Sequence, residues 1–183
     1  LENWMSYSDS SQQWIIQNQN INLTIIDGST PTDDNKSCII IYNQNECISP
    51  IVFGFTIQNG AGSQIIRNIG REDEEIQILG GGILSYVSNP TINYNHIRDN
   101  ASSENSSNRG DDLFSGGGVY ASTEPEDWGF DNTLLTSFRC DIQELDFSYN
   151  YYSGNYAMYG KTIASLSASA VPIPLNEFHL NLT

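Results

Sequence analysis

Three side chains in this sequence are of types that can carry out acid–base chemistry if they lie together. His96, Arg98 and Asp146 stand in short segments that align with one another, at positions that alternate with apolar residues. An imidazole, a guanidinium and a carboxylate on one patch can bind an acidic group and take a proton from a neighbouring carbon. The alternative is a solvated outer face with a surface ion pair, which contributes little to stability.

Paired carboxylates elsewhere in the chain are candidates for a calcium site. Asp33 and Asp34, and again Asp111 and Asp112, stand in polar segments that contain Asn, Ser, Gly or Pro. Clustered carboxylate oxygens are ligands that calcium prefers, but neither pair has the spacing of an EF-hand loop. Solvated charges are the alternative. The sequence requires no cofactor and leaves calcium open.

Aromatic residues offer a second kind of binding surface. Tyr151, Tyr152 and Tyr156 fall within a few residues of one another, and Trp128 lies in an acidic segment before them. Exposed rings can stack on sugars, whereas buried rings would cover the core beneath them. Both interpretations stay open, and the four residues are candidates for glycan binding.

The net charge limits the partners that such sites can have. The 183 residues include 22 acidic and 7 basic side chains, for a formal net charge of −15. A surface this negative repels nucleic acid and anionic lipid, whereas glycans and proteins remain possible partners. No apolar run approaches the length of a transmembrane helix, so we expect no membrane span in this segment.

The elements that must position these residues repeat along the chain. Segments 21–28, 52–59, 92–99 and 142–149 align without gaps; each begins with Ile or Val and has an apolar sixth residue. Stacked in this register, the outward side chains form the columns Thr56–His96–Asp146 and Gln58–Arg98–Ser148. The inward columns are Val52–Ile92–Ile142 and Ile26–Ile57–Ile97–Phe147. His96, Arg98 and Asp146 are thereby expected on one patch.

Glycine and asparagine mark the turns between these segments. Glycines 80–82 precede Ile83, glycines 116–118 precede Val119, and Gly160 begins a decayed copy. Glycine permits a tight turn and a close approach of neighbouring backbones. Asparagine tolerates the left-handed conformation and can form a hydrogen-bonded ladder between stacked copies. Asn59, Asn100 and Asn150 are the expected members of such a ladder.

The pattern predicts an all-β fold, a right-handed single-stranded parallel β-helix with long inserted loops, one of which spans residues 60–79. Strands of three to five residues cannot bury a face alone, but copies stacked about 4.8 Å apart pair with their neighbours. Connections between parallel strands of one sheet are almost always right-handed, so we expect the β-helix to wind in the right-handed sense. The alternative fold is an antiparallel β-sandwich. It would need hairpin turns roughly every 8–12 residues and a regular alternation of apolar and polar residues. We expect one domain over residues 1–183, and the start at Leu1 suggests a segment of a longer protein.

The three cysteines leave their pairing open. Cys38 and Cys47 flank a short segment, and they either close a small disulfide or remain two buried thiols. Cys140 is left over and is expected to be a buried thiol.

The repeated motifs resemble those of known right-handed β-helix proteins. FTIQNG followed by GGGI, and HIRDNA followed by GGGVY, are similar to the F-x-x-N and G-G-A-[ILV] repeats of polymorphic outer-membrane proteins. The likeness covers roughly residues 20 to 165, and the segment FSYN (147–150) matches the first motif outright. The chain departs from the family at Ile57 and Ile97, where the family has Phe, and at Gly82 and Gly118, where it has Ala.

The resemblance extends to the pectate-lyase-like superfamily, and it implies what the polar candidates would do there. In such enzymes calcium held by carboxylates neutralises a uronate, and an Arg or Lys takes its α-proton. His96, Arg98 and Asp146 would be the counterparts in this chain. The G-H-G and R-I-K motifs of polygalacturonase-like enzymes are missing.

We therefore expect a non-catalytic secreted or cell-surface module, adhesin-like or structural, that meets a glycan or protein partner through its inserted loops. One alternative is a polysaccharide lyase, a glycoside hydrolase or a glycan-binding module. A second is a self-assembling subunit, because the ends of a β-helix expose strand edges.

Overall fold

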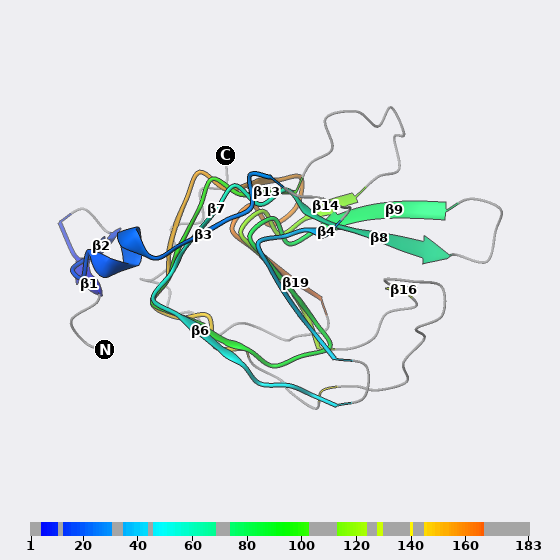
Figure 1. Ribbon diagram of the computed structural model, residues 1–183, viewed down its shortest axis with the longest axis horizontal. Coiled ribbons are helices and arrows are strands. Elements are labelled where there is room, and N and C mark those ends of the chain that lie inside the picture. Colours follow the sequence, from blue (N-terminus) through cyan, green and yellow to red (C-terminus); the bar gives the residue numbers. More distant parts are fainter. Residues whose placement is uncertain are drawn as a thin grey trace.

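The computed structural model describes an all-β chain (Figure 1). It describes residues 5–10, 13–30, 35–43, 46–68, 74–102, 113–123, 128–129, 140 and 145–166. Within these ranges the regular structure is almost entirely strand, and the one helix is the four-residue α1 (Asn20–Leu23). Runs of β-branched and aromatic residues broken by Asn and Gly favour such short strands. The all-β class predicted from the sequence is confirmed.

Four parallel strands form the first sheet, which we call sheet 1. They are β5 (Ile39–Tyr42), β10 (Ile83–Tyr86), β15 (Val119–Ser122) and β19 (Ile163–Leu166). The first residues of the four strands share one register position. The two glycine runs therefore precede equivalent strands, and the expected copy beginning at Gly160 is confirmed.

Sheets 2 and 3 are also parallel. Sheet 2 joins β3 (Ile25–Asp27), β7 (Thr56–Gln58), β12 (His96–Arg98) and β17 (Tyr151–Ser153). Sheet 3 joins β6 (Ile51–Phe53) and β11 (Thr91–Asn93), and Asp146 extends it by a parallel bridge to Thr91. Parallel pairing in all three is incompatible with an antiparallel sandwich.

The register agrees with the sequence alignment for three segments and corrects it for the fourth. Ile26, Ile57 and Ile97 share one position, as predicted. The residue that pairs with Ile97 from the next repeat is Tyr152, whereas the alignment placed Phe147 there. Because Asp146 bridges Thr91, Phe147 instead follows the register of Ile92, five residues earlier in the repeat. The predicted Val52–Ile92 pair is confirmed, and Ile142 lies outside the described residues.

The remaining strands lie outside these three sheets. The hairpin strands β1 (Met5–Ser8) and β2 (Gln13–Ile16) pair antiparallel, and β13 (Ala101–Ser102) pairs parallel with β18 (Tyr156–Ala157). A mixed sheet holds β4 (Asn35–Lys36), β8 (Gly62–Asn68), β9 (Glu74–Leu79), β14 (Leu113–Ser115) and β16 (Trp128–Gly129). The segment between Gly60 and Gly80, expected to be an inserted loop, thus folds largely into the antiparallel pair β8–β9.

The main hydrophobic core lies between the three parallel sheets. Each sheet contributes the residues of its inward column, and the largest buried members belong to the aligned segments or follow the glycine runs. They are Ile57, Ile83, Ile92, Ile97, Val119, Leu145 and Phe147. Full burial of one such Ile side chain stabilises the fold by about 2 kcal/mol.

The outer faces of the sheets differ in what covers them. Ile65 and Leu79 of the β8–β9 pair pack on Leu84 and Tyr120, which lie on the outer side of sheet 1. On sheet 2, the hydroxyl of Thr56 donates a hydrogen bond of 2.7 Å to a backbone oxygen of α1. No described helix or strand lies on the outer side of β6 in Figure 1.

Two ladders of asparagine side chains hold successive repeats together at the ends of sheet 2. The Nδ2 atom of Asn95 donates to Oδ1 of Asn150 at 3.1 Å, and Asn100 donates in the same way to Asn155 at 3.1 Å. All but Asn155 are almost completely buried. The ladder predicted from Asn59, Asn100 and Asn150 was wrong in membership. Asn100 and Asn150 belong to different ladders, and Asn59 is an exposed residue that donates to Asp27.

The residue before each ladder position has a left-handed backbone. These residues are Gly54, Tyr94 and Tyr149 at one corner of the repeat, and Asn59, Asp99 and Gly154 at the other. Their φ angles fall between 53° and 81°. For a residue other than glycine this conformation costs about 1 kcal/mol.

A disulfide joins two segments far apart in the sequence. Cys47 is bonded to Cys140, with Cα atoms 5.4 Å apart and a sequence separation of 93. Cys38 is a free, half-buried thiol. The suggested Cys38–Cys47 bond is wrong, and Cys140 is not a leftover thiol. The register explains this, because Cys38 lies beside β7 and its Sγ donates to the Gln58 carbonyl.

The glycine runs let backbones of neighbouring repeats approach closely. A Cβ atom on Gly81 would lie 2.2 Å from the Gly117 oxygen, and one on Gly117 would lie 2.5 Å from the Lys161 oxygen. Lys161 occupies the equivalent place in the last described repeat, since Gly117 N–H donates to the Gly160 carbonyl. Glycine is therefore required where another repeat follows.

We expect Gly117→Ala to lower the free energy of unfolding by at least about 2 kcal/mol, because the added methyl group overlaps backbone atoms. Lys161→Ala is the matched control and should change it by less than about 0.5 kcal/mol. Chemical denaturation of both variants measures the difference. Equal stabilities would show that the glycine run is not a packing requirement.

Loss of the Cys47–Cys140 bond should also destabilise the fold. Cys47→Ser is expected to cost about 2–4 kcal/mol, because the bond restricts a long loop in the unfolded chain. Peptide mapping without reductant should recover the Cys47–Cys140 linkage and a free Cys38. A Cys38–Cys47 peptide would contradict the observed pairing.

Candidate functional site

The outer face of sheet 2 carries two of the three predicted catalytic candidates. His96 and Arg98 flank the core residue Ile97 on β12, so strand alternation directs both side chains outward. Their columns are Thr56–His96–Tyr151 and Gln58–Arg98–Ser153. The first two members of each column are as predicted. Asp146 does not join them, because it pairs with Thr91 in sheet 3.

His96 is a buried imidazole in contact with one hydroxyl. Its Nε2 atom lies 3.0 Å from Oγ of Ser153, and its ring packs on Tyr151 at a centroid distance of 4.8 Å. The side chain is only 8% exposed, and Nδ1 has no hydrogen-bond partner among the described atoms. Burial, aided by the nearby charge of Arg98, lowers the pKa of His96 to about 4. The ring is therefore neutral at physiological pH.

This pair resembles part of a nucleophile–base arrangement but lacks what completes it. A histidine base is normally oriented by a carboxylate or carbonyl group on its second nitrogen. Nothing described fills that place at Nδ1 of His96. A base with a pKa of about 4 also has little driving force to take a hydroxyl proton at neutral pH.

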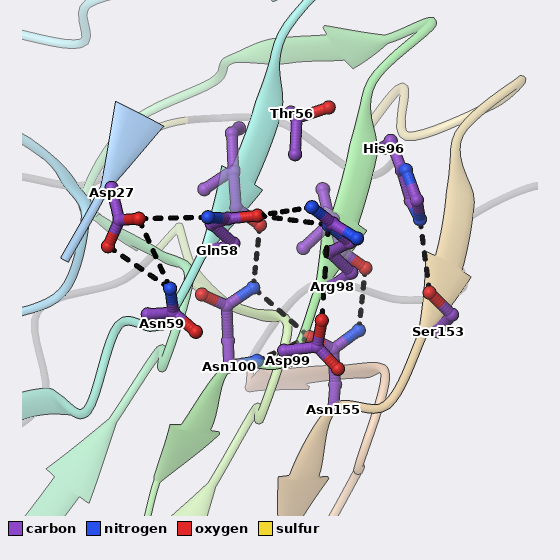
Figure 2. A network of polar contacts seen from close by, with 12 residues as sticks. Asp27, Thr56, Gln58, Asn59, His96, Arg98, Asp99, Asn100, Ser153 and Asn155 are labelled. Carbon is purple, nitrogen blue, oxygen red and sulfur yellow. Dashed lines mark hydrogen bonds and ion pairs between the residues drawn. The ribbon is translucent and has the colours of Figure 1, made fainter. Parts of the chain in front are cut away.

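Arg98 belongs to a polar row that crosses three strands of sheet 2 (Figure 2). Its Nε and Nη2 atoms donate to Oε1 of Gln58 at 3.0 and 2.6 Å, and Nε2 of Gln58 donates to Asp27 at 2.8 Å. Arg98 also lies 3.9 Å from the carboxylate of Asp99. Hydrogen bonds from Gln58, and then from Asn59, hold the pKa of Asp27 well below its usual range. The charges in this row are thus engaged with one another.

Asp146 makes its contacts on sheet 3. Its Oδ2 atom accepts a hydrogen bond of 3.0 Å from Asn93, and its Oδ1 atom accepts from the backbone and hydroxyl of Ser148. Partial burial acts to raise the pKa of Asp146, but these hydrogen bonds outweigh it and lower the pKa. The carboxylate is therefore ionised at neutral pH.

The three predicted glycan-binding tyrosines lie in different surroundings. Tyr151 is half-buried beside His96, Tyr152 packs against the core where burial raises its pKa, and Tyr156 is exposed on β18. Trp128 lies on β16, which pairs with β8, and only its backbone is described. The calcium candidates Asp33, Asp34, Asp111 and Asp112 lie outside the described residues.

The contribution of Ser153 and Tyr151 to this face was missed from the sequence. The signal that could have found them is the spacing of asparagines, since Asn95 and Asn100 flank β12 as Asn150 and Asn155 flank β17. Aligning these two pairs places Tyr151 beside His96 and Ser153 beside Arg98, as observed.

Two further properties of the described residues bear on the kind of site. Within them, no three His, Cys, Asp or Glu side chains are grouped closely enough to hold a metal ion. The four-residue α1 is too short to cross a bilayer, and no longer apolar helix occurs in the described part of the chain. Comparisons with protein-family models, curated proteins and solved structures gave no significant match.

The buried imidazole predicts acid sensitivity. Because the folded state lowers the pKa of His96 from 6.5 to about 4, the unfolded chain binds a proton first as the pH falls. The contribution of His96 to the free energy of unfolding is therefore fully present above pH 6.5. About 3 kcal/mol of this contribution is lost as the pH falls to about 4. Asp27 and Asp146 add losses only at lower pH, because their pKa values are lowered from 3.8.

The variant His96→Thr, which copies the residue at the equivalent position of β7, isolates this contribution. Denaturation of both proteins between pH 7 and pH 4 should show a steeper loss for the natural chain. Identical slopes would mean that His96 is not held neutral by the fold.

Proposed function

We propose that the chain is a right-handed parallel β-helix module of a secreted or cell-surface protein, related in architecture to the pectate-lyase-like superfamily and to polymorphic outer-membrane protein repeats. The in-register pairing of sheets 1, 2 and 3 between successive repeats supports this architecture. So does the glycine position that recurs at Gly80, Gly116 and Gly160, each with a left-handed backbone.

The proposed role is to bind a partner rather than to catalyse a reaction. The observation that carries this is the mutual pairing of the polar row on sheet 2, in which Arg98, Gln58 and Asp27 satisfy one another. A lyase would need a base and a carboxylate cluster directed at a substrate. Here the third expected member, Asp146, lies in sheet 3 and not on the outer face of sheet 2.

A secreted or cell-surface location is supported by the disulfide. The Cys47–Cys140 bond links segments 93 residues apart in sequence. Such structural disulfides form and persist in oxidising compartments.

A carbohydrate-active enzyme remains the second candidate, and one contact favours it. The 3.0 Å distance between His96 Nε2 and Ser153 Oγ places a neutral imidazole, a group that can act as a general base, beside a hydroxyl group. An enzyme of this kind would lose its activity with either Ser153→Ala or His96→Thr.

A turnover assay distinguishes the two candidates. The purified chain, incubated with polygalacturonate, xylan and chitin oligosaccharides with and without calcium, is expected to release no product detectable by mass spectrometry. Product release that disappears in Ser153→Ala would overturn the non-catalytic proposal. Product release unaffected by that substitution would indicate a contaminating enzyme, so the assay is run on both proteins in parallel.

A further inference from the structure

The outer face of sheet 3 is the surface that the described elements leave open. Ile51 is 71% exposed and Phe53 is 41% exposed, although both belong to a strand that pairs within the sheet. The outer sides of sheets 1 and 2 are contacted by the β8–β9 pair and by α1. An exposed apolar surface beside polar groups is typical of a binding face.

Two stacked tyrosines border this face at an unfavourable backbone position. Tyr94 and Tyr149 have φ angles of 56° and 58°, and their rings lie 5.1 Å apart with an interplanar angle of 8°. Glycine occupies the equivalent corner one repeat earlier, at Gly54. The other corner uses Asn59, Asp99 and Gly154, residue types that tolerate this conformation. Strained positions held by bulky residues indicate a role beyond folding.

A hydrogen-bond acceptor lies next to the tyrosines. Nδ2 of Asn93 donates a hydrogen bond of 3.0 Å to Oδ2 of Asp146 and so orients the Asp146 carboxylate, whereas Oδ1 of Asn93 is buried. Asp146 is exposed and ionised at neutral pH. The outward positions of β6 and β11, together with 146 and 148, include no Lys or Arg.

Together these groups select the chemistry of a ligand. Exposed apolar rings favour a ligand with an apolar face, and an exposed carboxylate favours one with hydrogen-bond donors. The absence of Lys and Arg from these described positions, in a chain of net charge −15, disfavours uronates, sulfated glycans and nucleic acid. A neutral sugar has both an apolar face of C–H groups and several hydroxyl donors.

We propose that the outer face of sheet 3, bordered by Tyr94 and Tyr149, binds a neutral glycan. Pyranose rings pack against the tyrosine corner and Phe53, and sugar hydroxyls donate to Asp146. This names the partner class of the binding module proposed above, and to that extent it rests on that function.

The test measures binding of neutral β-1,4-linked hexasaccharides to the full chain. Cellohexaose, xylohexaose and N-acetylchitohexaose serve as probes in calorimetric titrations of the natural chain and of Tyr94→Gly, Tyr149→Gly and Asp146→Asn. At least one probe should bind, and each substitution should weaken it tenfold or more. Asn59→Gly, at the equivalent place of the other corner, is the matched control and should bind within twofold of the natural chain.

The glycine variants also keep the result interpretable. Gly54 shows that the corner accepts glycine, so both variants should retain the fold, and their melting temperatures are measured beside the titrations. Failure of all three probes to bind overturns the proposed face, as does binding that Tyr94→Gly, Tyr149→Gly and Asp146→Asn leave within twofold.

Turnover of a hexasaccharide gives a different result. If the probe binds with the expected variant pattern but is cleaved, the proposed binding face is supported and the proposed non-catalytic function is wrong. If no probe binds and none is cleaved, the proposed binding face is wrong, whereas the proposed non-catalytic function is not contradicted. The two proposals therefore fail by different observations.

Discussion

The asparagine ladders are the constraint on which the rest of the described structure depends. Each short strand of sheet 2 in two successive repeats begins after one ladder position and ends before another, at Asn95 and Asn100 and again at Asn150 and Asn155. The Asn95 and Asn100 side chains also accept from backbone N–H groups of the preceding repeat, at Phe55 and Gly60. Turn backbones leave donors and acceptors unpaired, and a buried unpaired group costs about 1–3 kcal/mol. The ladders satisfy these groups where no β-pairing can.

This constraint explains both the success and the error of the sequence alignment. A motif of one apolar residue, two further residues and Asn occurs twice in the repeat that contains β11 and β12, as Ile92 to Asn95 and again as Ile97 to Asn100. Phe147 to Asn150 matches either copy equally well. With no gaps allowed, the alignment matched the second copy, and the register is the first. The strands and their inward residues were therefore predictable, whereas the neighbours of His96 required the second asparagine pair, Asn150 and Asn155.

Other features could not follow from the sequence for a physical reason. The disulfide partner of Cys47 is set by which segments the stacked sheets bring together, and Cys140 is 93 residues away. The β8–β9 pair begins in a glycine-containing segment of mixed polarity, and its stability comes from Ile65 and Leu79 packing on a sheet built from distant residues. The amino-acid composition of a short segment does not indicate which distant residues it will contact. The glycine positions, by contrast, were predictable because backbone contact between repeats excludes every other residue type at Gly81 and Gly117.

The two corners of the repeat differ in the residues that occupy the left-handed position. Both corners need a left-handed residue before the ladder asparagine, and evolution of such a position toward Gly, Asn or Asp relieves strain. One corner follows this preference with Asn59, Asp99 and Gly154, and its side chains serve the fold, as Asn59 does by donating to Asp27. The other corner places Tyr94 and Tyr149 in the same conformation, beside the sheet face that no described element covers. Two residues that the backbone disfavours thus occupy a place where glycine fits one repeat earlier. At this corner the disfavoured conformation lies beside an open face, whereas the similarly strained Val87 is buried in the core, so it is the strain together with exposure that supports the proposed binding face.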